Sequence, residues 1–101
     1  MRIIWTRTAR TDLRFIFDYY KYKANLFTAQ KIKNACLDRV NILYQNPEAG
    51  SLDEFLEPLK ENHRYLVEGN YKIIYKISSD IIFITGVFDT RQNPEKIISK
   101  N

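Results

Sequence analysis

The sequence has little of what metal centres and disulfide scaffolds require. Its 101 residues include one cysteine, Cys36, and one histidine, His63. A single cysteine cannot form an internal disulfide, and one Cys with one His cannot build a structural zinc site. We therefore predict no metal site and no cofactor. A cytoplasmic location is the simpler interpretation of this cysteine usage.

Long apolar runs and the common catalytic loops are missing as well. The longest mostly apolar stretch, Ile81–Phe88, is too short to cross a bilayer, and the N-terminus lacks the apolar core of a signal peptide. The chain has 3 glycines and contains neither a glycine-rich phosphate loop nor a Gly-x-Ser-x-Gly elbow. These absences predict a small cytosolic protein with no membrane partner.

The residues that are present give a globular composition with an uneven charge. Hydrophobic residues make up 45% and aromatics 14%, and the length predicts one domain over residues 1–101 with one modest core. Residues 1–50 carry nine Lys/Arg against four Asp/Glu, a net +5, whereas residues 51–101 carry seven against eight, a net −1. A basic half suits a polyanion or an acidic protein segment, although a solvated helix surface has the same composition.

Three strand-like runs dominate the C-terminal half. Gly69-Asn70 lies between β-branched and aromatic residues, a pattern typical of a type II′ hairpin turn. Ser78-Ser79-Asp80 separates Tyr71–Ile77 from Ile81–Phe88 and predicts a second hairpin. Three antiparallel strands with one apolar face need a cover from elsewhere in the chain.

The N-terminal half is predicted to supply that cover. Arg2–Thr6 alternates apolar and polar side chains and predicts a short strand. Two helices follow, with Thr6 or Thr8 as the first cap, Asn25 or Thr28 as the second, and Asn46-Pro47 ending the second helix. Their apolar positions recur at helical spacing: Ala9, Leu13, Ile16, Phe17 and Tyr20, then Ala29, Ile32, Cys36, Val40 and Leu43.

Counting layers gives the fold class. We predict an α+β fold in which an N-terminal strand and an antiparallel two-helix hairpin precede an antiparallel sheet of about four strands, with the helices on one face. The acid-rich connector 48–62 is predicted to tuck its leucines against the sheet or to form a short strand; a surface loop that neutralises basic helix residues is the alternative. The other sheet face is predicted to stay largely open and to bind a partner.

The hairpin register decides which side chains share the open face. A two-residue turn at Gly69-Asn70 sets Val67 opposite Lys72. A three-residue loop would instead bring Arg64 across to join Lys72. With the shorter turn, the more polar face, which is predicted to be the open one, carries His63, Tyr65, Val67, Lys72, Ile74 and Lys76. The other face carries Arg64, Leu66, Ile73 and Tyr75.

Cations near this face are the candidate binding residues. Arg91 follows the last strand, and with Lys72, Lys76 and His63 it is predicted to line a basic concavity suited to phosphate. An ion pair between Arg91 and Asp89 that fixes the strand end is the plainer interpretation, as is an exposed, idle imidazole for His63. Three other candidates fit the core better than a site: Cys36, Tyr71 and Tyr75.

The chain resembles the RelE/ParE superfamily of toxins from bacterial type II toxin–antitoxin systems. The resemblance covers nearly the whole chain and is most specific in its C-terminal strands. The matching segments are Ile4-Trp5-Thr6 with Ala9 and Asp12-Leu13, Asn46-Pro47 with Gly50, Arg64–Ile77, and Val87–Pro94.

The resemblance implies a growth-inhibiting toxin that an antitoxin encoded beside it neutralises. Such antitoxins typically wrap the toxin with a C-terminal segment that is disordered alone. ParE-like members inhibit DNA gyrase by binding it, whereas RelE-like members cut mRNA on the ribosome without a metal. The residues expected to contact the target or antitoxin are Arg64, Lys72, Lys76, Asp89 and Arg91.

RNA cleavage would need a base, an acid and phosphate-stabilising cations. By resemblance, Lys72 and Arg91 would stabilise phosphate; His63 is the candidate base because it titrates near neutrality, and Tyr65 would assist. The C-terminal catalytic tyrosine of RelE has no counterpart, since Ile97 falls there. The ParE-like function is therefore preferred, with a RelE-like ribonuclease and a degenerate toxin that only binds its antitoxin as the alternatives.

Overall fold

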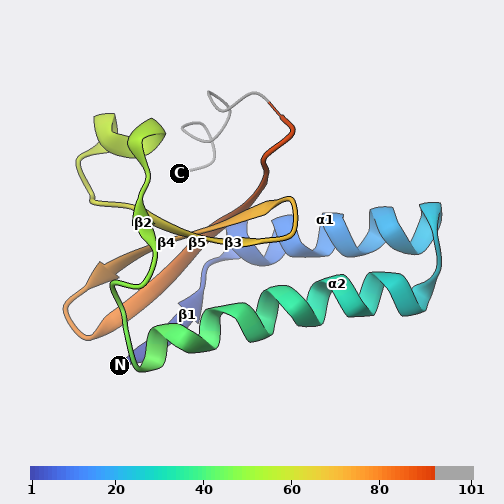
Figure 1. Cartoon of the computed structure of the whole chain (residues 1–101), viewed down its shortest axis with the longest axis horizontal. Helices are drawn as coiled ribbons and strands as arrows, with labels where there is room; N and C mark the ends of the chain where they lie inside the picture. Colours follow the sequence, from blue (N-terminus) through green and yellow to red (C-terminus); the bar gives the residue numbers. More distant parts are fainter. Residues whose placement is uncertain (93–101) are drawn as a thin grey trace.

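A computed structural model describes residues 1–92, and its architecture confirms the predicted α+β class. Helices α1 and α2 form an antiparallel pair that packs against one face of the sheet and extends beyond its edge (Figure 1). In chain order the elements are β1 (Arg2–Trp5), α1 (Arg7–Lys23), α2 (Leu26–Arg39), the 3₁₀ helix η1 (Val40–Tyr44), β2 (Ser51–Leu52), the 3₁₀ helix η2 (Glu54–Leu59), β3 (Arg64–Glu68), β4 (Tyr71–Ser78) and β5 (Ile81–Asp89).

The sheet has five strands in the order β1-β5-β4-β3-β2 and is mixed. The fifth strand is β2, from the connector, which pairs with β3. The prediction of a wholly antiparallel sheet is wrong at the other edge, because β1 pairs in parallel with β5. Parallel neighbours need a long crossover connection, and the helical pair is the first part of that connection.

Side-chain caps fix where the helices begin. The Thr6 hydroxyl accepts a hydrogen bond from the Ala9 amide at 3.2 Å, and the Asn25 side chain accepts one from the Thr28 amide at 2.8 Å. Each bond satisfies an amide that has no partner within its helix, and each confirms one of the two predicted caps. The regular part of the second helix ends earlier than predicted, at Arg39, and tightens into η1 before the chain reaches Pro47.

The β3–β4 hairpin has the shorter of the two registers considered. Val67 pairs with Lys72, Tyr65 pairs with Ile74, and Gly69 has a φ of 57°. A positive φ at the first turn position and not at the second is the type II′ geometry, which glycine adopts without a Cβ clash. Arg64 therefore stays on the face opposite Lys72.

The two sheet faces support two separate apolar clusters. The larger one joins the sheet to α1 and α2 and includes Cys36, whose burial raises the pKa of its thiol to about 11 and keeps it protonated. This confirms that Cys36, Tyr71 and Tyr75 are core residues. The fully buried or nearly buried members are Ala9, Leu13, Cys36, Val40, Leu43, Leu66, Tyr71, Ile73, Tyr75, Ile82, Ile84 and Val87.

The face predicted to be open is partly covered. Leu56 of η2 is 1% exposed and packs with Ile74 and Phe88 on the side of the sheet away from the helices. Both structures predicted for the connector are therefore present: the short strand β2, and leucine side chains that pack against the sheet. The negative charge of the connector compensates a cation of the sheet and not the basic residues of the helices, because Asp53 forms an ion pair with Lys72 of β4.

A close approach of backbone and tyrosine joins the connector to the core. The Gly50 amide donates to the Tyr75 hydroxyl at 2.9 Å, and that hydroxyl donates to the Pro47 carbonyl at 2.8 Å. A Cβ at position 50 would lie 2.6 Å from the Tyr65 carbonyl oxygen, so only glycine fits there. Burial raises the pKa of Tyr75, which keeps this donor protonated.

Candidate functional site

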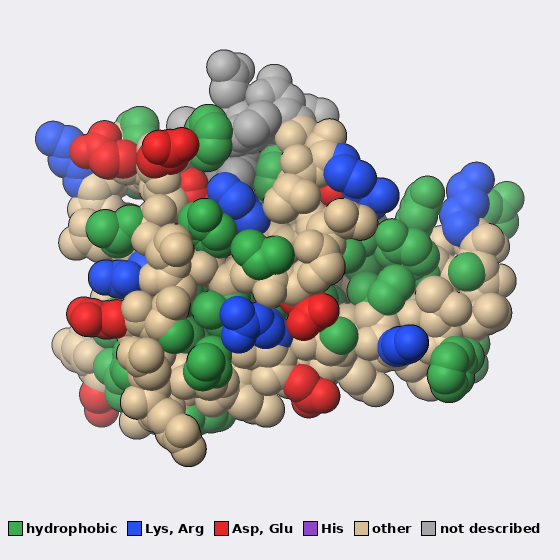
Figure 2. Space-filling model, viewed as in Figure 1, with side chains coloured by type: hydrophobic (Ala, Val, Ile, Leu, Met, Phe, Trp, Pro, Cys, Tyr) green, Lys and Arg blue, Asp and Glu red, His purple; other side chains and the backbone are tan. Residues whose placement is uncertain are grey.

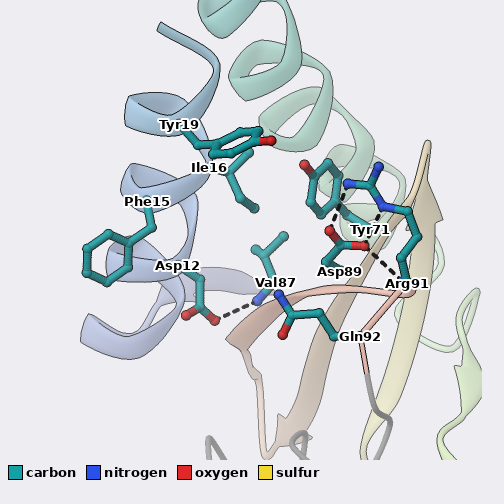
Figure 3. A pocket seen from close by; sticks show the side chains of 9 residues that line it. All are labelled: Asp12, Phe15, Ile16, Tyr19, Tyr71, Val87, Asp89, Arg91 and Gln92. Atoms are coloured by element: carbon teal, nitrogen blue, oxygen red, sulfur yellow. Dashed lines mark hydrogen bonds and ion pairs between the residues drawn. The ribbon is translucent and has the colours of Figure 1, made fainter. Parts of the chain in front are cut away.

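A hollow of about 400 Å³ lies between α1 and the C-terminal end of β5 (Figure 3). Helix α1 forms one wall, β4 and β5 supply the floor, and the turn after β5 closes the opposite side. Two of the predicted site residues, Asp89 and Arg91, belong to it. The lining residues are Asp12, Phe15, Ile16, Tyr19, Tyr71, Val87, Asp89, Arg91 and Gln92.

Asp89 and Arg91 form a two-pronged ion pair at the rim of this hollow. Arg91 Nε lies 2.9 Å from Asp89 Oδ1 and Nη2 lies 2.8 Å from Oδ2, while the Arg91 amide also donates to Oδ1 at 2.9 Å. Hydrogen bonding to Arg91 lowers the pKa of Asp89, and the Asp89 carboxylate raises the pKa of Arg91. The predicted ion pair is confirmed, and it fixes the direction of the guanidinium.

Buried polar groups hold the floor of the hollow in place. Asp12 is 7% exposed, and its Oδ2 accepts a hydrogen bond from the Val87 amide at 3.0 Å, which links α1 to β5. The Tyr71 hydroxyl donates to the Tyr20 hydroxyl at 3.3 Å. Burial is the main cause that raises the pKa of Tyr71. The Tyr71 hydroxyl therefore stays protonated at neutral pH and is a hydrogen-bond donor in the floor.

Aromatic side chains on the exposed surface of α1 continue the hollow outward. Phe15 is 63% exposed and Tyr19 is 55% exposed, although both are large and apolar. Figure 2 shows hydrophobic side chains gathered over the part of the helical layer that extends beyond the sheet. Neither residue was predicted from the sequence to belong to a site. Their signal was an i, i+4 aromatic pair lying outside the apolar stripe of the helix.

Lys72 belongs to a different environment, on the sheet face that η2 covers. Its Nζ lies 3.6 Å from Asp53 Oδ2, 4.3 Å from the Tyr65 ring centre and 5.4 Å from the Phe55 ring centre. The Lys72 side chain is 19% exposed, and Asp53 Oδ2 is buried with no hydrogen-bond partner. The ammonium group therefore compensates a buried carboxylate and sits over two aromatic rings.

The remaining predicted residues also have partners within the fold. His63 is 2% exposed, so an exposed imidazole is the wrong interpretation, and burial lowers its pKa, with the neighbouring Glu61 opposing that shift. Lys76 Nζ binds Glu61 at 2.8 Å. Arg64 donates from one guanidinium nitrogen to the carbonyl of Gly50 at 2.7 Å. These contacts give all three residues a structural role.

The predicted basic concavity is not formed. Tyr71 and Lys72 are neighbours in β4, so their side chains point to opposite faces. Arg91 bonds Asp89 on the Tyr71 face, whereas Lys72 bonds Asp53 on the η2 face. Of the four residues considered for RNA cleavage, His63, Tyr65 and Lys72 lie on one face and Arg91 lies on the other.

The geometry of the hollow suits recognition of another molecule. A fixed guanidinium, a carboxylate and an amide side chain, from Gln92, line it beside exposed aromatic rings. Such a surface supplies apolar contact and directed hydrogen bonds. Among residues 1–92, no group of three or more His, Cys, Asp or Glu side chains is arranged to hold a metal ion, and no helix is long and apolar enough to cross a membrane.

The sequence was compared with models of known protein families. The model of the ParE toxin of the type II toxin–antitoxin system parDE matches residues 3–94. The chain belongs to the ParE toxin family. This membership confirms the superfamily that the sequence resembles.

A solved structure shares the fold of this ParE family member. It is the chromosomal ParDE TA system from P. aeruginosa, and the match has a TM-score of 0.75 and 22% sequence identity. The match covers 88% of this chain and 95% of the other. Among curated protein sequences, none matches the chain significantly.

Proposed function

We propose that this ParE family member inhibits growth by binding DNA gyrase, without cutting RNA. The observation that carries the proposal is the separation of Lys72 from Arg91 by the sheet. Cleavage of a phosphodiester needs its base and its cations around one phosphate. Here the candidate base His63 is buried, and the charge of Lys72 is engaged by Asp53.

Asp89, Arg91 and the aromatic rim of α1 are the residues to which we assign contact with the target. Arg91 has a side chain that is 57% exposed, and its bonds to Asp89 hold it at the rim of the hollow. Arginine and aromatic side chains are the residue types most often decisive in protein interfaces. Arg64 and Lys76 bond to other parts of the fold. We therefore expect them to stabilise the toxin without touching the target.

Under this proposal an antitoxin encoded beside the gene keeps the toxin inactive. A segment that orders on binding can cover several separate patches of a small protein. The exposed aromatics and the basic first half of the chain give such a segment both apolar and charged contacts.

The test is induction of the protein in cells without the antitoxin. We expect growth arrest with double-strand DNA breaks and an SOS response, and inhibition of supercoiling when the purified protein is added to gyrase. Codon-positioned mRNA cuts in translating ribosomes would instead identify a ribonuclease. Antitoxin binding without growth arrest would identify a degenerate toxin.

Two variants locate the activity. Arg91→Ala is expected to weaken gyrase inhibition by on the order of 10-fold or more, because it removes an interface cation at the rim of the hollow. Lys60→Ala changes an exposed cation outside the hollow and is the matched control. If mRNA cleavage occurs and His63→Ala leaves its rate unchanged, His63 is removed from any catalytic role.

A further inference from the structure

Three arginines, called the arginine row below, lie along the outer side of α1. Arg7, Arg10 and Arg14 recur at i, i+3 and i+7 and are all exposed. Ala9 and Leu13 of the same helix are buried in the core, which places the row on the solvent side. Within residues 1–92, the ion pairs all involve cations outside α1, so none of them engages the row.

The arginine row and Thr11 line a hollow of about 240 Å³. These side chains offer a ligand three guanidinium groups and one hydroxyl. Arg10 and Arg14 also line a neighbouring hollow whose floor is apolar, formed by Trp5, Leu13, Phe17 and Leu37. Among the described residues, no apolar side chain lines the hollow of the arginine row. The two hollows therefore suit different ligands.

The polar lining indicates the chemical class of its ligand. A guanidinium group presents a planar fork of N–H donors that matches the oxygens of a phosphate. A peptide with apolar side chains would gain no apolar contact here. Unpaired bases stack on aromatic rings, and none of the described residues that line this hollow is aromatic. Phosphates whose bases are stacked away inside a duplex fit best.

The length of the arginine row also fits a duplex. A rise of 1.5 Å per residue puts the Cα atoms of Arg7 and Arg14 about 10.5 Å apart along the helix axis. Each strand of duplex DNA carries one phosphate per roughly 3.4 Å of its axis. The row therefore spans about three phosphate steps of one strand. Asp18 follows Arg14 by one turn on the same side, so the basic surface ends there.

We propose that the arginine row of α1 binds the phosphate backbone of duplex DNA. Phosphate contacts carry no direct sequence information, so this binding is independent of base sequence. A second step rests on the proposed function: toxin bound to gyrase also holds the DNA that gyrase carries. Phe15 and Tyr19, which we assign to the gyrase contact, lie on the adjacent side of the same helix, so both contacts can form at once.

Titration of the purified toxin with a labelled 20-base-pair duplex tests the first step without gyrase. Fluorescence anisotropy gives the Kd between about 25 and 200 mM salt. Each phosphate contact contributes about 0.9 to the slope of log K against log salt. We expect the variant Arg7→Gln, Arg10→Gln, Arg14→Gln to lose about 2.7 of that slope and to raise the Kd on the order of 10-fold or more at low salt.

A matched control separates the arginine row from overall charge. The variant Lys21→Gln, Lys23→Gln, Lys31→Gln removes the same three charges from the same helical layer, at exposed positions outside the hollow. We expect it to lose less than about 1 of the slope. Glutamine has a helix propensity close to that of arginine and lysine, and the urea midpoint of each variant verifies that the fold is intact.

The second step is tested by measuring toxin binding to gyrase with and without bound duplex. Two linked contacts bind more tightly than either contact alone. We expect DNA on the gyrase to lower the Kd of wild-type toxin by about 10-fold and that of the arginine-row variant by less than about 2-fold. Without DNA, the two proteins are expected to bind gyrase equally well.

The outcomes that contradict the proposal differ from those that contradict the proposed function. The proposal is overturned if the toxin does not bind the duplex, if both triple variants lose the same slope, or if single-stranded DNA of the same length binds more tightly. Weaker binding of the arginine-row variant to DNA-free gyrase would make the row a protein contact instead. If wild type does not bind gyrase at all, the proposed function fails, and the duplex titration still decides whether the row binds DNA.

Discussion

Lys72 of the sheet and Arg14 of α1 are both basic side chains, yet only Lys72 has an acidic partner in the described chain. The Lys72 side chain is mostly buried, and its ammonium compensates Asp53 and lies over aromatic rings. Arg14 is exposed and lines a hollow whose floor is apolar. The same charge therefore stabilises the fold in one region and stays available to a partner in the other.

This difference changes where an anionic partner is expected to bind. A cation whose charge is already compensated gains less from a new anion than one surrounded by water. The sheet residues chosen from the sequence as phosphate ligands are of the first kind. The helical layer, which carries most of the excess positive charge, has the second kind.

Among the variants that test the contrast between Lys72 and Arg14, Asp53→Ala is expected to have the largest effect on stability. The substitution leaves Lys72 without its carboxylate and removes the bond from the Phe55 amide to Asp53 Oδ1 at 2.9 Å, which caps η2. We expect a loss of about 3 kcal/mol in the free energy of unfolding, measured by urea titration. Glu54→Ala, at the exposed neighbouring position, is the control, and equal losses for both would contradict a structural role for the pair.

A direct comparison of the two cations comes next. Lys72→Met keeps the aliphatic stem and leaves a buried carboxylate without its cation, so we expect a loss of about 2 kcal/mol. Arg14→Met removes an exposed charge and is expected to change stability by less than about 0.5 kcal/mol. Similar urea midpoints for the two variants would show that burial of the ion pair does not matter.

Protonation of His63 is expected to contribute to the pH dependence of the free energy of unfolding. Burial lowers the pKa of His63 below the usual 6.5. As the pH falls, the unfolded chain therefore binds a proton at a higher pH than the folded chain does. His63 therefore adds no penalty above about pH 6.5, and stability falls as the pH decreases from there through the pKa of the folded state. The slope of one proton is at most about 1.4 kcal/mol per pH unit.

Urea titrations between pH 5 and 8 measure this slope, and His63→Gln is expected to flatten it above the range where carboxylates titrate. The lowered pKa values of Glu61 and Asp89 place their contributions at lower pH. An unchanged slope in His63→Gln would assign the transition to another group.

The smallest effect on stability is expected for Arg91→Ala. The Arg91 side chain is 57% exposed, so the loss of its pair with Asp89 is expected to leave the urea midpoint nearly unchanged. The same variant is expected to weaken gyrase inhibition, which separates a contact residue from a structural one. A large fall in stability would instead make Arg91 part of the scaffold.

Local patterns allowed much of the fold to be predicted. The caps at Thr6 and Asn25, the hairpin at Gly69-Asn70 and the buried stripe that includes Cys36 follow from spacing and turn chemistry within a few residues. The parallel pairing of β1 with β5 was not predicted, because it joins segments about eighty residues apart whose own sequences are compatible with either direction.

The candidate site was predicted less well, for a related reason. Asp89 with Arg91 is a contact within one turn, and the sequence was enough to identify it. Lys72 was predicted to be available because the connector was expected to leave that sheet face open. The connector instead folds η2 over the face and places Asp53 beside Lys72, a long-range contact that no local pattern encodes.

By itself, the sequence determined the type of layer each segment forms, the position of the central hairpin turn and the excess of positive charge in the first half of the chain. These properties depend on period, turn residues and composition, which neighbouring residues specify. Only the tertiary structure decided which cations are compensated and which remain free, because charge pairing depends on distances between segments that fold together from far apart in the chain.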